Sequence, residues 1–155
     1  MALGAVAETV SGTALAAWAS TDPLAYPIAN VVHLLGLVLL IGGIGLVDLR
    51  LIGAFRALPL RTLARSLTPL GLGGLALLAA SGAILFAADP AVAESETFRT
   101  KLLLIAAALA NAILFRFRYG AAPDEPVPTS ARLLGATSLA LWLSVAAFGR
   151  MIAYS

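Results

Sequence analysis

The sequence predicts an all-α integral membrane protein, a single domain in which a bundle of four hydrophobic helices crosses a lipid bilayer. Of its 155 residues, 61% are apolar and only 12% are charged, whereas roughly a quarter of the residues in an average soluble domain are charged. A water-soluble fold would have too few polar residues to cover its surface. Four long segments are also almost free of charge, and helices in a membrane can stay apolar where they face lipid.

Residues 5–19 are expected to form a short helix that lies on the membrane surface. The stretch is weakly amphipathic, and Trp18 would anchor it at the boundary between lipid and water. It lacks the basic start of a secretory signal, and Glu8 interrupts its apolar run, so we expect it to stay in the mature protein.

The first two membrane helices are expected over residues 23–51 and 64–88. The charge-free stretch after Asp22 has 25 residues, and the one after Arg65 has 23 residues. A transmembrane helix needs about 20 mostly apolar residues, so both stretches are long enough to cross a bilayer.

The third and fourth membrane helices, over residues 98–119 and 130–154, have shorter charge-free stretches. Only 14 uncharged residues separate Lys101 from Arg116, so this helix crosses the membrane if the two side chains extend to opposite interfaces. The fourth helix crosses if Arg150 bends toward water. Three spanning helices plus a re-entrant segment form the alternative.

The basic residues predict how the protein is oriented. The loop between the first two helices and the loop between the last two hold seven arginines: Arg50, Arg56, Arg61, Arg65, Arg116, Arg118 and Arg132. The other side holds three basic residues: Arg99, Lys101 and Arg150. Cytoplasmic loops carry the excess of basic residues, so both termini are expected on the periplasmic side of a bacterial inner membrane. Orientation explains the net charge of +2, and no nucleic-acid partner is expected.

His33 is the only histidine and the main candidate for a functional residue. It lies about two turns inside the outer end of the first membrane helix, where titratable groups are costly and indicate function by default. Ala29, Gly36, Leu40 and Gly43 share its helical face. Two interpretations stay open. The small residues let another helix approach, with His33 hydrogen-bonded across the interface, or the smooth face binds a flat cofactor, with His33 as an axial ligand of haem b.

A haem site would need further groups. A low-spin b-type haem has two strong axial ligands, and the second could be His33 of another copy of the chain, Met151, or a residue of another subunit. Arg150 would pair with a haem propionate, as would Lys101 and Arg99. In the competing interpretation these three cations anchor their helices at the membrane interface.

Three residues inside the predicted helices have more limited expected roles. Trp142 lies too deep for an interfacial position, so it is expected to fill the core or to flank a cofactor. Asn111 is expected to form a hydrogen bond between helices. Asp48 is expected to form an ion pair with Arg116 or Arg118, as a structural latch more than as a proton site.

Several functions are disfavoured by the residue types that the sequence lacks. There are no cysteines and only one histidine, so no Ser-His-Asp or Cys-His set is available for nucleophilic catalysis. No glycine-rich loop precedes a Lys-Ser or Lys-Thr pair, which disfavours phosphate binding of the P-loop kind. Copper prefers soft or clustered imidazole ligands, so a self-contained copper pump is improbable.

Four segments carry a resemblance to a known family: Val32–Gly43 with the run VHLLG, Val47–Leu51, Phe98–Leu102 and Gly149–Tyr154. They resemble an uncharacterised bacterial inner-membrane family, a domain of unknown function that is distantly similar to the CopD-type copper-resistance membrane proteins. The resemblance runs along nearly the whole chain. It implies a four-helix membrane fold and a metal or redox context. The family has a tryptophan where this chain has Met151, so the resemblance does not support that methionine as a ligand.

The sequence therefore favours a haem-binding or redox-associated component of the bacterial inner membrane, with a site at His33, Gly36, Gly43, Trp142 and Arg150. The alternatives are a structural or accessory subunit of a larger membrane complex without its own cofactor, and a component for transport of a metal or small solute. The expected partners are the lipid bilayer and either further copies of the chain or a larger complex.

Overall fold

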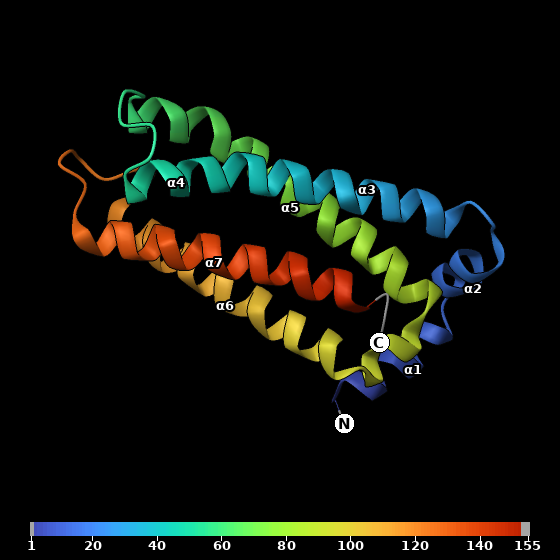
Figure 1. Cartoon of the computed structure of the whole chain (residues 1–155). Helices are drawn as coiled ribbons and strands as arrows, with labels where there is room; N and C mark the ends of the chain where they lie inside the picture. Colours follow the sequence, from blue (N-terminus) through green and yellow to red (C-terminus); the bar gives the residue numbers. More distant parts are fainter. Residues whose placement is uncertain (1, 153–155) are drawn as a thin grey trace.

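The computed structural model describes residues 2–152, and all regular elements among them are helices (Figure 1). Four helical segments are long and apolar enough to cross a membrane: Ala25–Ile52, Leu60–Ala88, Glu96–Tyr119 and Thr129–Met151. The predicted fold class, an all-α bundle of four hydrophobic helices, is confirmed. The predicted end of the fourth helix at residue 154 lies outside the described residues.

The first long segment is interrupted by a wider turn of helix. It consists of α3 (Ala25–Leu40), the π-helical turn η1 (Ile41–Gly45) and α4 (Leu46–Ile52). Three of the five residues of η1 are glycine, which is a poor residue for the interior of an α-helix. The sequence predicts one continuous helix here. Hydropathy does not detect the π-turn, because all of its residues are still apolar or small.

The N-terminal surface helix is divided into two. The short helices outside the four spans are α1 (Ala2–Ser11), α2 (Ala14–Thr21) and the 3-10 turn η2 (Pro90–Glu94). The helix is interrupted at Gly12. The side chain of Thr13 then accepts a hydrogen bond from the backbone N–H of Ala16, which caps the start of α2. The single helix predicted over residues 5–19 is therefore wrong at this break.

The long helices pair as two hairpins. α3 packs along α5 (Leu60–Ala88), α6 (Glu96–Tyr119) packs along α7 (Thr129–Met151), and α4 joins the hairpins by packing on α7. Figure 1 shows α3 and α5 crossing in the upper part of the view and α6 and α7 running side by side below them. The two hairpins meet closely at the end that carries α4.

Glycines allow the backbones of α3 and α5 to approach each other. A Cβ atom placed on Gly74 would lie 2.6 Å from the carbonyl oxygen of Gly36, and one placed on Gly43 would lie 2.6 Å from the backbone nitrogen of Gly71. No side chain larger than hydrogen fits at these positions without moving a helix. Close backbone approach over small residues is the usual way in which membrane helices associate.

Buried apolar side chains form three clusters along the bundle. The cluster at the α4 end contains Val47, Leu51, Leu60, Ala64, Ala122 and Ala131. The central cluster contains Leu40, Ala108, Trp142 and Val145. The cluster at the opposite end joins α2 to α5 through Ala16, Ala19 and Ala87. The small size of these clusters fits a bundle that is covered by lipid as well as by its own helices.

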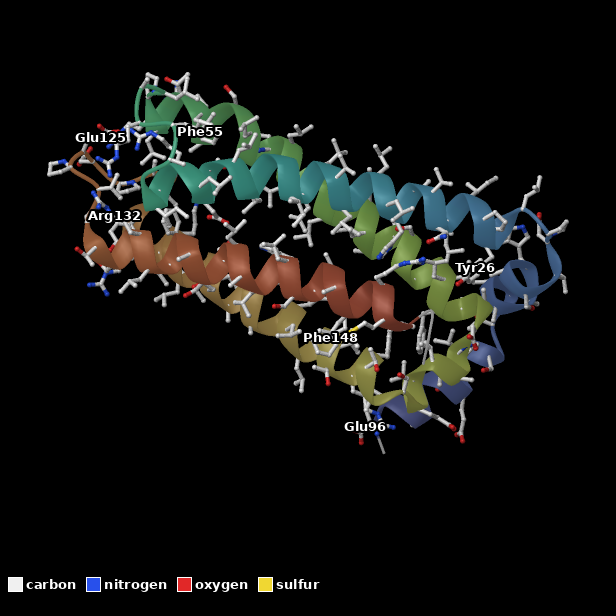
Figure 2. The ribbon with its side chains drawn as sticks, in the orientation of Figure 1. Tyr26, Phe55, Glu96, Glu125, Arg132 and Phe148 are labelled. Atoms are coloured by element: carbon white, nitrogen blue, oxygen red, sulfur yellow. The ribbon has the colours of Figure 1, made fainter. Side chains whose placement is uncertain are left out.

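Large apolar side chains point outward along the spans. Val38 is 67% exposed, Leu103 is 72% exposed and Phe117 is 87% exposed. Figure 2 shows side chains extending from all long helices, with labelled charged residues at the ends: Glu125 and Arg132 at one end and Glu96 at the other. Apolar flanks with charged ends are the pattern that a bilayer requires.

Candidate functional site around His33

His33 points from α3 toward α5 and forms a hydrogen bond there. Its Nδ1 atom lies 2.9 Å from the hydroxyl oxygen of Ser81. That hydroxyl donates its hydrogen to the backbone oxygen of Leu77 at 2.5 Å, so it acts as an acceptor toward the imidazole. The network therefore assigns the ring hydrogen to Nδ1 and leaves Nε2 as the unprotonated nitrogen.

The backbone of α5 supports the same orientation of the ring. The backbone carbonyl of Leu78 also acts on His33, and its oxygen lies 3.5 Å from the Ser81 hydroxyl. Next to it, Gly82 leaves room for the ring, since a Cβ atom at this position would lie 3.4 Å from Cε1 of His33. The half-buried imidazole thus has one nitrogen fixed by α5.

The other hairpin brings a cation to this end of the bundle. Lys101 of α6 is partly buried, and it is the charged side chain that acts electrostatically on His33. Its Nζ atom lies beside α7, because a Cβ atom placed on Gly149 would be only 3.3 Å from it. The ends of α3, α5, α6 and α7 on the side away from α4 therefore contribute to one polar region.

Arg150 and Arg99, the other residues predicted to pair with haem propionates, differ from each other in their positions. Arg150 follows Gly149 near the end of α7 and is exposed, so it lies at the same end of the bundle as Lys101. Arg99 uses its Nε atom to donate a hydrogen bond to the backbone oxygen of Ala93 at 3.0 Å. That bond holds the turn before α6.

Gly36 and Gly43 do not line open space. The sequence predicts that they form a smooth face for a flat cofactor, but this face is covered by the backbone of α5. A porphyrin cannot occupy it, because even a Cβ atom would come within 3.0 Å of α5 atoms at both positions. The assignment of these glycines to a cofactor is corrected, and they belong to the contact between two helices.

Trp142 and Asn111 have structural positions. Trp142 is 5% exposed and lies in the central cluster with Leu40 and Val145, so it fills the core. Asn111 of α6 donates from Nδ2 to the backbone oxygen of Leu134 in α7 at 3.1 Å. The predicted role of Asn111 as an interhelical hydrogen-bonding residue is confirmed.

The predicted ion pair of Asp48 is wrong. The ion pairs among residues 2–152 join Arg50 to Glu125 and Arg61 to Asp124. Asp48 is 5% exposed and faces α7, where its hydrogen-bond partner is Ser138. A carboxylate near arginines in the sequence suggests an ion pair, but the rotation of the helix directs the Asp48 side chain toward α7.

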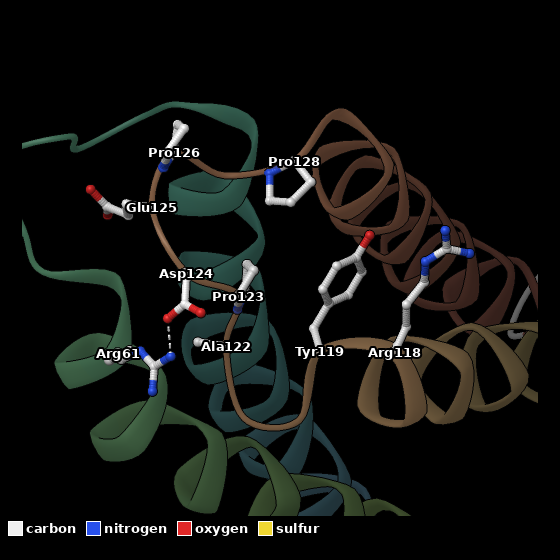
Figure 3. Close-up of a pocket in the computed structure, with 9 residues that line it drawn as sticks. All are labelled: Arg61, Arg118, Tyr119, Ala122, Pro123, Asp124, Glu125, Pro126 and Pro128. Atoms are coloured by element: carbon white, nitrogen blue, oxygen red, sulfur yellow. Dashed lines mark hydrogen bonds and ion pairs between the residues drawn. The ribbon is translucent and has the colours of Figure 1, made fainter.

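The two loops at the α4 end, residues 53–59 and 120–128, are tied together by Arg50 of α4, for which the sequence predicts only a role in orientation. Its Nε atom donates to the backbone oxygen of Leu58 at 2.8 Å, and its Nη2 atom donates to Glu125 at 2.6 Å. Two shallow cavities of about 460 and 390 Å³ lie at this junction and share Arg61 and Glu125 in their walls. Figure 3 shows the larger one, with Asp124 reaching Arg61 across it.

The residues that could hold a metal are few. Within residues 2–152, no group of three or more histidine, cysteine, aspartate or glutamate side chains is arranged to hold a metal ion. A bare ion at His33 would have a single protein ligand. Haem differs, because the porphyrin itself supplies four nitrogen ligands and needs only axial ligands from the protein.

The comparisons with known proteins provide no family. The chain matches no protein-family model, no curated protein and no solved structure.

Proposed function

We propose that this chain is a haem-binding, redox-associated component of the bacterial inner membrane, with Nε2 of His33 as an axial ligand. The observation that supports the proposal is the fixed imidazole. Its Nδ1 hydrogen is directed at Ser81, which leaves Nε2 unprotonated. Histidines that bind metals usually have this arrangement, in which a second residue fixes the tautomer and the ring orientation.

The surroundings of His33 favour haem over a bare metal ion. A single imidazole cannot hold an ion alone, and residues 2–152 offer no cluster of ligands near it. Haem would lie on the Nε2 side of the ring, since α5 covers the Nδ1 side. Lys101 and Arg150, both at this end of the bundle, are cations that would pair with its propionates.

Each residue would contribute one function to the site. Ser81 and Leu78 orient the imidazole, Gly82 gives it space beside α5, and Lys101 balances negative charge. When bound, haem would supply the capacity for one-electron transfer. The second axial ligand would come from another copy of the chain, from another subunit or from Met151, which is 55% exposed at the same end.

The absorption spectrum of protein purified from cells supplied with haem tests the proposal. We expect a Soret band in the wild type and its loss in His33→Ala, with helicity by circular dichroism unchanged. Met151→Leu is the matched variant for the second ligand, and it should change the spectrum only if this methionine binds iron. Folded wild-type protein without a Soret band would refute the proposal.

The alternative function is that of an accessory subunit without a cofactor. It is favoured by α6, which has only one buried residue, Ala108, and exposes Leu103 and Phe117 to its surroundings. An accessory subunit should co-purify with a partner at fixed stoichiometry in mild detergent. The same preparation should then contain no haem in this chain.

The proposed location is the bacterial inner membrane, with both termini in the periplasm. Seven arginines lie on the side of the two connecting loops and three basic residues lie on the other side, and the excess of basic residues marks the cytoplasmic side. His33 would then lie in the periplasmic half of the membrane. A redox partner would approach it from the periplasmic side or within the bilayer.

A further inference from the structure

Asp48 is a buried carboxyl group inside a membrane-spanning segment. The residue is 5% exposed, and its Oδ2 atom is buried with no hydrogen-bond partner among residues 2–152. Its hydrogen-bond partner is Ser138 of α7, itself only 7% exposed. A buried polar atom without a partner is uncommon in folded proteins and calls for an explanation.

No cation neutralises this carboxyl group in the described part of the chain. Arg50, two residues further on, is directed to Leu58 and Glu125. On the elements packed against α4, the charged residues are Arg61 and Arg65 of α5 and Arg132 and Arg150 of α7. Arg150 lies near the end of α7, far along the helix from Gly135, which contacts α4. Arg61 pairs with Asp124, and Arg65 and Arg132 are exposed. Arg116 and Arg118 of α6 are also exposed, and neither forms an ion pair with Asp48.

The immediate surroundings of Asp48 are apolar and closely packed. Its neighbours Val47 and Leu51 are buried in the apolar cluster at this end of the bundle. On α7, a Cβ atom placed on Gly135 would lie 3.1 Å from Leu51 and 3.5 Å from the backbone oxygen of Asp48. An ionised carboxylate enclosed in this way would carry a large desolvation cost, whereas a neutral acid would not.

The π-turn contributes to this placement. η1 ends at Gly45, three residues before Asp48. A π-turn widens the helix by one residue per turn, so it rotates the following residues by about 100° relative to a continuous α-helix. That rotation determines which side of α4 faces α7. Such turns are frequent at functional sites.

From this geometry we infer that Asp48 is a proton-binding site, held as a neutral carboxylic acid between α4 and α7. The ligand is a single proton, which balances the negative charge in the absence of a cation. Ser138 holds one face of the group. The position is about one turn from Ile52, the last residue of the span, so the proton exchanges with the side of the membrane that carries the two connecting loops. The inference does not depend on haem.

A hydrophobic carbodiimide tests the protonation state directly. The acid transfers its proton to one carbodiimide nitrogen, its oxygen bonds to the central carbon, and the acyl group then moves to the other nitrogen. The whole reagent is retained as a stable N-acylurea, and nothing is released. With full-length protein in phospholipid vesicles, mass spectrometry should find the adduct on Asp48 and a decline in labelling as pH rises. The adduct should be absent in Asp48→Asn.

Infrared spectroscopy provides a second measurement that needs no reagent to reach the site. We expect the carbonyl band of a protonated carboxyl group at neutral pH in the wild type, and its loss in Asp48→Asn. The amide is an uncharged isostere, so this variant should keep the thermal stability of the wild type. Ser138→Ala, the matched variant, should retain the protonated band with a shifted frequency. A wild type without this band, together with an unstable Asp48→Asn variant, would overturn the inference.

Discussion

The Ser81 hydroxyl has two hydrogen bonds that act together. It donates to the Leu77 backbone oxygen and accepts from His33, so the α5 backbone indirectly fixes the hydrogen on Nδ1. A residue on one helix thereby determines which nitrogen of a residue on another helix is available. The sequence indicated His33 as a candidate, but it did not indicate Ser81, because the two are 48 positions apart.

Ser81→Ala tests this arrangement at the level of one side chain. The variant loses the acceptor for Nδ1, although the Leu78 carbonyl remains near the ring, so we expect haem affinity to fall about 10- to 100-fold. Haem titration of purified protein measures the change. Ser144→Ala is the matched control, because the Ser144 hydroxyl bonds its own helix at Ala140 in the same way and has no histidine partner. Equal affinities in both variants would show that Ser81 does not orient the ligand.

At the scale of helices, the contact between α3 and α5 depends on only some of the glycines of α5, because neighbouring glycines lie on different faces of that helix. Gly74 faces α3 closely, whereas a Cβ atom placed on Gly73, its neighbour in the chain, would have nothing within 4 Å. Both residues are glycines of α5, so they differ only in the face of the helix on which they lie.

Replacing each of these glycines by alanine should have opposite effects on the free energy of unfolding. In Gly74→Ala the new methyl group would lie 2.6 Å from two backbone atoms of α3, which forces the helices apart. We expect a loss of about 1–3 kcal/mol, as for other overpacked sites. Gly73→Ala should be neutral or stabilising by up to about 1 kcal/mol, because alanine has the higher helix propensity. Unfolding in mixed detergent micelles measures both, and similar losses would refute the packing assignment.

Sequence patterns predicted the elements better than their interruptions. Long apolar stretches located all four spans, because lipid demands apolar residues over a whole crossing regardless of packing. The third and fourth spans also required Lys101, Arg116 and Arg150 to extend to the interfaces. The π-turn at Ile41–Gly45 and the break at Gly12 follow from local backbone preferences that a hydropathy pattern does not contain. Asn111 was predicted correctly because a polar amide in the middle of an apolar helix has few roles other than bonding a neighbouring helix.

For the whole molecule, two loops far apart in the sequence form one polar end. Arg50 and Glu125 are 75 positions apart, and their ion pair joins the first hairpin to the second. Pairings of this kind depend on how the hairpins are placed in space. The sequence therefore predicted that both loops lie on one side of the membrane. It did not predict which charged residues form ion pairs there, or that Asp48 forms no ion pair with these arginines.

The predicted orientation can be measured with single cysteines, because the natural chain has none. Ala57→Cys lies in the exposed loop before α5, and Ala91→Cys lies in the exposed turn η2 at the opposite end. In intact cells with a permeabilised outer membrane, a membrane-impermeant maleimide should label Ala91→Cys and leave Ala57→Cys unlabelled until the inner membrane is opened. The reverse pattern would invert the orientation and place His33 in the cytoplasmic half.

The hairpin architecture also determines the order in which the protein assembles during synthesis. Only η1, α4 and a short loop separate α3 from α5, so their glycine contact can form before α6 has left the ribosome. α6 and α7 then enter the membrane as a second unit, since the chain is made from the N-terminus onward. The contact of α4 with α7 and the pairing of Arg50 with Glu125 join the first unit to the second, so they form only after the second unit has been made.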